Sequence, residues 1–259
     1  MRLVAAEFRK LTYQRAMWGL LIAGVLFAML GTIATPFIID QSADGLGFGT
    51  LAEVAVVDSV YANAISAYIF SVIVGVLIVA GEFRHGTAVA TFVAAPRRGR
   101  VLLAKLWVSA IAGLILQVIA TAAGFGAGAL AMMAFPDAAT PSADIFINTS
   151  IGAVVSGAVL GILGAAVGAL LRSQILALMS VLIWLFAIEP ILLLLVPDQG
   201  KYFLSGLITS MVALDVQSEQ FNLDTGDFLS PLVSIGFLLV YGALFSVLAL
   251  ISSMRRDIE

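Results

Sequence analysis

The sequence contains no cysteine, a single histidine (His85) and few charged residues. The lack of cysteine excludes disulfides and thiolate chemistry, and a single histidine excludes zinc sites built from Cys and His. Any Ser–His catalytic couple would depend on His85. Charged residues make up 11% of the chain and apolar residues 61%, whereas soluble domains have about 25% and about 45–50%. This composition excludes a soluble globular domain, a disordered chain and a nucleic-acid binder built on basic patches.

Long uncharged runs dominate what is present. Six of them are long enough to cross a hydrocarbon core about 30 Å thick. They are Ala16–Ile39, Ser59–Gly81, Leu106–Pro136, Ile145–Leu171, Ser173–Pro197 (broken once, by Glu189) and Phe228–Met254. The first is too long for the apolar part of a cleaved signal peptide, so we expect it to be retained. The sequence predicts an all-α membrane protein, with one domain over residues 1–259 and six transmembrane helices.

The basic residues predict the orientation. With the N-terminus inside, 12 of the 13 Lys and Arg residues fall in inside segments, and only Lys201 falls outside. The acidic residues gather in the segments that would then be outside. By the positive-inside rule, we expect both termini to be cytoplasmic in a multi-pass protein of the plasma (inner) membrane.

Residues 1–16 have the pattern of an amphipathic helix. Val4, Phe8, Leu11 and Trp18 share one helical face, and basic residues stand off it. We expect this helix to lie in the inner membrane interface, with its basic side chains toward lipid headgroups or a partner. The alternative is a solvated lead-in to the first span.

The outside segment 198–227 is longer than the other connections and half apolar. Its apolar stretch Tyr202–Leu214 is too short to span a bilayer. We therefore expect a short re-entrant or interfacial helix between the fifth and sixth spans.

The inside segment 82–105 places an apolar stretch between charges. It opens with Glu82 and Arg84 and ends in a basic cluster that leads into the third span. Between them, Thr87–Ala95 has the composition of a short helix, which Pro96 would end. Apolar residues outside the bilayer need something to bury against. That is the bilayer surface, the chain's own helices or a cytosolic partner.

These features together resemble the ABC-2 type transporter permeases. The resemblance rests on Glu7 and Lys10 in the N-terminal helix, the GEFRHGT stretch at 81–87, the PRRGR turn at 96–100, a Lys opening the third span and the apolar segment before the sixth. It covers essentially the whole chain. It implies the membrane subunit of a bacterial exporter, paired with a soluble ATP-binding subunit and with a second permease copy or a sister permease.

The resemblance also implies a coupling site. In the family, the N-terminal helix and the loop between the second and third spans dock on the ATPase. The positions that carry over here are Glu82, Arg84, His85, Gly86, Thr87, Pro96, Arg97 and Arg98. ATP and Mg would bind the partner, because the chain has no G-x-x-x-x-G-K-[ST] motif. We expect no enzyme activity, no metal and no cofactor in this chain.

Glu189 is the only formal charge inside an expected span. An intramembrane carboxylate is costly and is a functional candidate. It would contact a cationic substrate or a gate. Alternatively it has a structural role beside Pro190, where it would cap backbone groups freed by a helix break or sit in an outer vestibule.

Five uncharged polar residues are further candidates for a substrate path: Asn63, Tyr68 and Ser71 in the second span, and Gln117 and Thr121 in the third. Such residues also bond their own helix backbone or bridge two helices. The few charges favour an amphipathic drug, antibiotic, peptide or lipid-like substrate.

Glycine pairs four residues apart predict close helix packing. They are Gly124/Gly128 in the third span and Gly157/Gly161 and Gly164/Gly168 in the fourth. We expect them to pack within the chain, with a contact between two subunits as the alternative.

Two other classes of function remain open. One is a membrane sensor or scaffold without transport. The other is an intramembrane enzyme, which would need converging catalytic groups at membrane depth. Glu189 stands alone there, and His85 lies at the inner rim.

Overall fold

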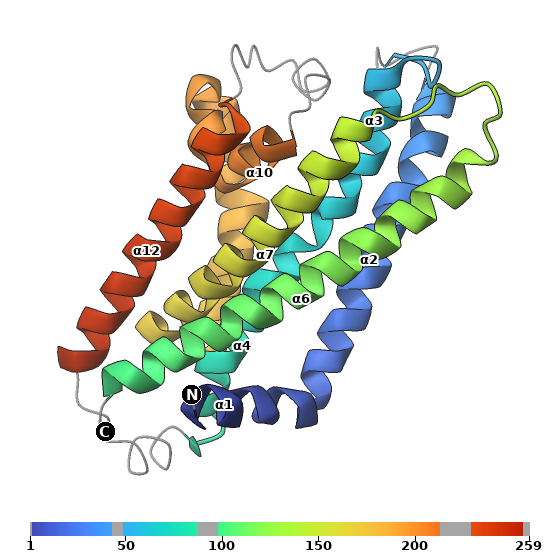
Figure 1. Ribbon diagram of the computed structural model, residues 1–259. Coiled ribbons are helices and arrows are strands. Elements are labelled where there is room, and N and C mark those ends of the chain that lie inside the picture. Colours follow the sequence, from blue (N-terminus) through green and yellow to red (C-terminus); the bar gives the residue numbers. More distant parts are fainter. Residues whose placement is uncertain (1, 43–48, 88–97, 213–228, 256–259) are drawn as a thin grey trace.

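The computed structural model describes residues 2–42, 49–87, 98–212 and 229–255, and every regular element in these ranges is a helix (Figure 1). Six helical units are long and apolar enough to cross a membrane: Arg15–Gln41, Val54–Arg84, Gly99–Met132, Ala143–Leu171, Gln174–Leu195 and Pro231–Ser252. The prediction of an all-α fold with six helices long and apolar enough to span a membrane is confirmed for the described residues. Such an arrangement is that of a multi-pass helical membrane protein.

The chain begins with a separate helix, α1 (Arg2–Tyr13), which lies across one end of the bundle (Figure 1). Val4, Phe8 and Leu11 pack against the core formed by the spans. Trp18 belongs to the next helix, α2 (Arg15–Ser42), because the helix breaks at Gln14. It still lines a small pocket together with Phe8 and Leu11. Trp18 is 55% exposed, and its indole Nε1 donates to the Thr12 carbonyl at 3.1 Å.

The second span consists of three pieces. They are α3 (Val54–Ala62), the 3-10 turn η1 (Asn63–Ala67) and α4 (Tyr68–Arg84). A 3-10 turn has i→i+3 hydrogen bonds, whose geometry is poorer than that of α-helical ones. Two carbonyls of η1 also accept hydrogen bonds from side chains of the third span, as described below.

The helix of the third span, α6 (Arg98–Met132), starts within the segment 82–105 that was expected to be cytoplasmic. Lys105 therefore lies inside this helix, and it is 3% exposed. The charges at the start of α6 do not stop the helix, because Arg and Lys are good helix formers.

The fourth span, α7 (Ala143–Leu171), packs between α4 and α6. A side-chain Cβ at Gly161 would collide with the Ser109 carbonyl of α6, and one at Gly164 would collide with the Val72 carbonyl of α4. The pair Gly124/Gly128 of α6 packs in the same way, since a Cβ at Gly124 would lie 2.8 Å from the Ala64 Cβ of the second span. The prediction that these pairs pack within the chain is confirmed.

The fifth span joins α8 (Gln174–Ile183), a π-helical turn η2 (Trp184–Ile188) and α9 (Glu189–Leu195). After it come the 3-10 turn η3 (Pro197–Tyr202) and the short helix α10 (Leu204–Val212), within the segment where a short helix was expected. The last span is α12 (Pro231–Arg255).

The first, fifth and sixth spans form the periphery. Their most apolar windows are 28%, 17% and 22% buried, against 56–61% for the other three. Large apolar side chains such as Leu30, Leu194 and Leu232 are exposed on them. This is the surface expected where lipid, not water, surrounds the helices.

Candidate functional site

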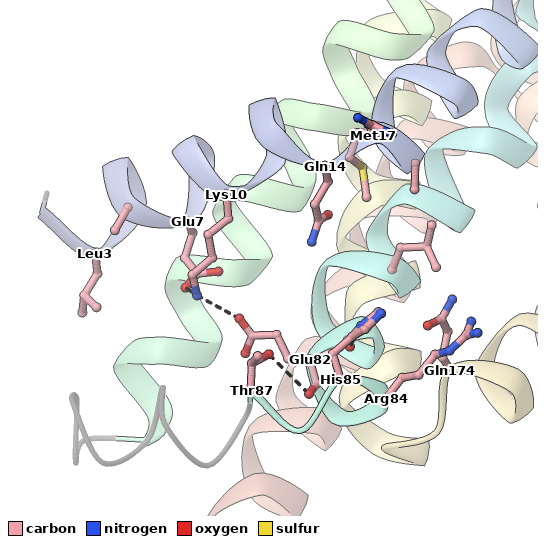
Figure 2. A pocket seen from close by; sticks show the side chains of 15 residues that line it. Leu3, Glu7, Lys10, Gln14, Met17, Glu82, Arg84, His85, Thr87 and Gln174 are labelled. Atoms are coloured by element: carbon pink, nitrogen blue, oxygen red, sulfur yellow. Dashed lines mark hydrogen bonds and ion pairs between the residues drawn. The ribbon is translucent and has the colours of Figure 1, made fainter.

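Four charged residues from three helices form one ion cluster at the end of the bundle that α1 crosses. Glu7 and Lys10 come from α1, Glu82 from the end of α4 and Lys105 from α6. The Lys105 ammonium lies 2.8 Å from Glu7 Oε2 and 2.7 Å from Glu82 Oε1. The Lys10 ammonium lies 2.7 Å from Glu7 Oε1 and 2.9 Å from Glu82 Oε1. Two ammonium groups thus bridge two carboxylates and tie α1 to both spans. Figure 2 shows the contact between Lys10 and Glu82.

The cluster is largely shielded from solvent. The side chains of Lys105, Glu7 and Glu82 are 4%, 7% and 13% exposed, whereas that of Lys10 is 46% exposed. Burial is the largest influence on Glu7 and disfavours its charge, but Lys105 and Lys10 outweigh it and hold the pKa of Glu7 below its usual range. Burial also disfavours the charge of Lys10, yet hydrogen bonds to Glu7 and Glu82 raise the pKa of Lys10. Glu7 and Lys10 therefore both keep their charges near neutral pH.

A pocket of about 900 Å³ lies beside this cluster, between α1 and the end of α4. Glu82, Arg84, His85 and Thr87 line it from the α4 side, together with Glu7, Lys10 and Gln14 from the α1 side and Gln174 from the start of α8 (Figure 2). The structure therefore brings four of the predicted coupling residues together with α1.

The predicted coupling residues divide into those inside and those outside the described part of the chain. His85 follows α4, and its Nδ1 lies 2.7 Å from the Gly81 carbonyl. Gly86 has φ +67°, a conformation that favours glycine, and so turns the chain away from the helix. Arg98 begins α6. Pro96 and Arg97, and the short helix expected over Thr87–Ala95 beyond Thr87 itself, lie outside the described residues.

Glu82 has a more specific placement than the sequence indicated. Its carboxylate is bound by two lysines inside the protein, and the Thr87 hydroxyl donates to its backbone carbonyl at 3.5 Å. Arg84 and His85 are the exposed charged or titratable groups at this end of α4. Both belong, like Glu82, to the predicted coupling residues.

Sequence reasoning did not include Glu7 and Lys105 among the site residues. Glu7 is 98 positions from Lys105, and nothing local pairs them. A usable signal existed nevertheless. Lys105 lies among apolar residues in the chain, and a lysine in such a place needs a carboxylate when it is buried.

The polar residues of the second and third spans hold helices together. The Gln117 amide donates to the Ile65 carbonyl at 2.7 Å, and the Thr121 hydroxyl donates to the Ala64 carbonyl at 3.1 Å. Both acceptors lie in η1, and the Ile65 carbonyl also accepts from the Tyr68 backbone N–H. The Ser71 hydroxyl donates to the Gly113 carbonyl at 3.1 Å. These three side chains are nearly fully buried, so they bridge spans in this conformation and do not face an open path.

Two further path candidates are less buried. The Asn63 amide donates to the Thr35 hydroxyl at 3.2 Å and to the Ser59 carbonyl at 3.1 Å. Tyr68 begins α4, is half-buried and lies within the electrostatic field of the Glu189 carboxylate.

Glu189 is 1% exposed and caps the start of α10. Its Oε1 accepts hydrogen bonds from the Ser205 backbone N–H and from the Ser205 hydroxyl, both at 2.6 Å. Its Oε2 is buried without a hydrogen-bond partner among the described residues. The group that it caps belongs to α10 and not to the backbone beside Pro190, and the contact holds α10 against the fifth span. Across the described ranges, no group of three or more His, Cys, Asp or Glu residues is placed to hold a metal ion.

Fold and site together define a six-span helical protein whose N-terminal helix is fixed to two central spans by buried charges. The chain matches no protein-family model and no curated protein.

Proposed function

We propose that this chain is the membrane-spanning permease subunit of an ATP-driven exporter and couples to a separate ATP-binding subunit. The observation that carries the proposal is the ion cluster of Glu7, Lys10, Glu82 and Lys105. Such a cluster makes α1, the end of α4 and the start of α6 one mechanical unit. A partner that pushes on this end would therefore move the second and third spans together.

The packing of α7 extends this argument into the membrane. The glycine contacts leave no space between α7 and its neighbours α4 and α6. Close-packed interfaces transmit a displacement instead of absorbing it. Movement at the α1 end would thus reach the spans that surround any translocation path. The exporter would work as a pair of permease subunits in the plasma (inner) membrane, with this end in the cytoplasm and an amphipathic or lipid-like compound as substrate.

The proposal is tested by purification of the chain from its own host in mild detergent, with mass spectrometry of what accompanies it. We expect a soluble ATPase with a Walker motif in near-stoichiometric amount. The variant Arg84→Glu reverses an exposed charge at the expected docking surface and should reduce the amount of ATPase recovered. The matched charge reversal Lys201→Glu lies in η3, after the end of the fifth span that is remote from Arg84. It should leave the amount of ATPase recovered unchanged.

Export itself is measured in vesicles that hold both subunits. ATP-dependent movement of an amphipathic dye, lost in Arg84→Glu and kept in Lys201→Glu, is the expected result. Recovery of the chain alone, folded and intact, would contradict the proposal and favour a sensor or scaffold.

A further inference from the structure

An apolar cavity of about 570 Å³, here named the lateral cavity, lies between the fifth and sixth spans. Its walls include Leu163 and Val167 of α7, Trp184 and Leu185 of η2, and Tyr241 and Phe245 of α12. The helices α8 and α12 both pack on α7. Apart from α7, the main neighbour of α12 is α10, and the main neighbour of α8 in the other spans is α4. The cavity thus occupies the space that two peripheral spans leave between them.

One end of the lateral cavity is closed by the chain. Tyr202, Phe203 and Leu204 line it there, and the Tyr241 hydroxyl donates to the Tyr202 carbonyl at 2.9 Å. The Glu189–Ser205 hydrogen bonds fix the start of α10 at the same place. A membrane-spanning helix of a partner is about 10–12 Å wide and runs the full depth of the bilayer. This closed end prevents such a helix from lying along the whole cavity.

The wall contributed by the fifth span is irregular. Trp184 and Leu185 belong to the π-helical turn η2, in which the backbone bonds run i→i+5. π-Helical turns are rare and are frequently found at functional sites. Here the turn lies directly against the cavity and sets the position of two of its wall residues.

The chemistry of the walls selects hydrocarbon over water. A buried water needs two to four polar partners. Two of the polar groups at the wall, the hydroxyls of Tyr241 and Ser180, are already bonded to the backbone carbonyls of Tyr202 and Ala177. The other lining residues with a polar group, Tyr202 and Trp184, each have only one, at the edge of an aromatic ring. The volume falls within the range of about 300–1,000 Å³ typical of small-molecule sites. The surrounding spans are apolar enough to lie in a bilayer, where acyl chains are the solvent.

We propose that the lateral cavity binds one acyl chain of a membrane lipid. The closed end limits the occupant to something shorter than a transmembrane helix, and the apolar walls favour a hydrocarbon chain that enters sideways from the bilayer. This site does not depend on the proposed exporter function, because it requires only the walls and the membrane.

Native mass spectrometry of the detergent-purified chain tests the proposal. We expect one phospholipid to stay bound per chain after extensive delipidation. Val167→Trp fills the cavity from α7 and should cause loss of this lipid. The matched control Val154→Trp adds the same bulk on the same helix at a position that is 43% exposed, and should retain it. The proposal would be overturned if both variants retained the phospholipid equally. It would also be overturned if Val167→Trp converted a dimer to a monomer and the lipid stayed bound.

A second measurement uses no substitution in the cavity. The chain has three tryptophans, and Trp18 and Trp107 are 55% and 65% exposed away from the cavity. Trp18→Phe/Trp107→Phe leaves Trp184 as the only emitter. The variant is titrated in detergent with a phospholipid that carries bromine in its acyl chains. The Trp184 fluorescence should be quenched, and the quenching should saturate at one lipid per chain. Quenching that rises without saturation would show partition only and would overturn the proposal. Neither experiment depends on an ATPase. Failure of the lipid-binding proposal is therefore distinguishable from failure of the proposed exporter function.

Discussion

Lys105 of α6 and Glu7 of α1, 98 positions apart in the sequence, form an ion pair of 2.8 Å in which both side chains are at least nine-tenths buried. A buried charge whose partner is removed is strongly destabilising, because nothing else compensates for its lost hydration. The pair therefore makes the position of α1 a condition for stable packing of the third span.

Removal of Lys105 should cost far more than removal of Lys10, although both bind the same two carboxylates. We expect Lys105→Met to lower the free energy of unfolding by about 3–5 kcal/mol, since it leaves Glu7 and Glu82 buried with one counter-charge. Lys10→Met should cost less than about 1 kcal/mol, because Lys10 is 46% exposed and solvent screens its interactions. Equilibrium unfolding in mixed micelles measures both. Equal losses would mean that burial does not set the strength of the cluster.

The stability of the protein should depend on pH through Glu7. The pKa of Glu7 in the folded chain lies below its ordinary value of 4.5. Its contribution is therefore fully present above pH 4.5 and is lost as the pH falls through the folded-state pKa. We expect the unfolding midpoint of the native chain to fall more steeply below this pH than that of Glu7→Gln. The two curves should converge in acid, and parallel curves would contradict the assignment.

Lys10 should have the opposite dependence. Its pKa is raised above the ordinary 10.5, so its contribution is present below pH 10.5 and is lost as the pH rises through the folded-state value. Lys10→Met should remove part of the alkaline fall in the unfolding midpoint, while the acid limb stays.

The spans were predictable because lipid imposes a strong demand on sequence. A run that crosses hydrocarbon must be long and apolar, and its backbone must be helical, so composition alone locates it. The glycine pairs of α7 were predictable for a related reason, since four-residue spacing puts both glycines on one face. The start of the helix α6 could not be located in this way, because hydropathy marks where a chain leaves lipid, not where its helix begins.

The ion cluster and the irregular turns were not predictable in the same way. Glu7, Glu82 and Lys105 meet only after three helices have packed, and the distance between them in the sequence carries no sign of it. The 3-10 turn at Asn63–Ala67 and the π-helical turn at Trp184–Ile188 are changes of hydrogen-bond register. Such changes leave the apolar composition untouched, so a hydropathy reading cannot detect them.

Close packing around Gly164 should make this position intolerant of any side chain. A Cβ there would collide with the Val72 carbonyl of α4, and backbone cannot move as a flexible side chain can. We expect Gly164→Ala to lower the unfolding midpoint strongly, as overpacking costs about 1–3 kcal/mol. Gly126→Ala is the control, since nothing lies within 4 Å of its Cβ position. It should be neutral or stabilise by up to about 1 kcal/mol through helix propensity.

Substitution of Glu189 separates its capping role from contact with a cationic substrate. Glu189→Gln keeps an oxygen that accepts from the Ser205 N–H and hydroxyl, so stability should stay close to that of the native chain. Glu189→Leu leaves both donors without this acceptor and should cost about 1–3 kcal/mol. Thermal unfolding in detergent distinguishes the two variants. Loss of activity in Glu189→Gln at unchanged stability would favour the substrate role.

The orientation can be tested cleanly because the chain has no cysteine, so a single introduced thiol is the only site that a maleimide can label. Thr140 lies between α6 and α7, and Gln14 lies between α1 and α2; both are exposed and uncharged. We expect a membrane-impermeant maleimide to label Thr140→Cys in intact cells and Gln14→Cys only after permeabilisation. The reason is the excess of Lys and Arg on the Gln14 side, which translocates poorly. The reverse pattern would place the ion cluster outside the cell, where no ATP-binding subunit could reach it, and would rule out the proposed coupling along with the orientation.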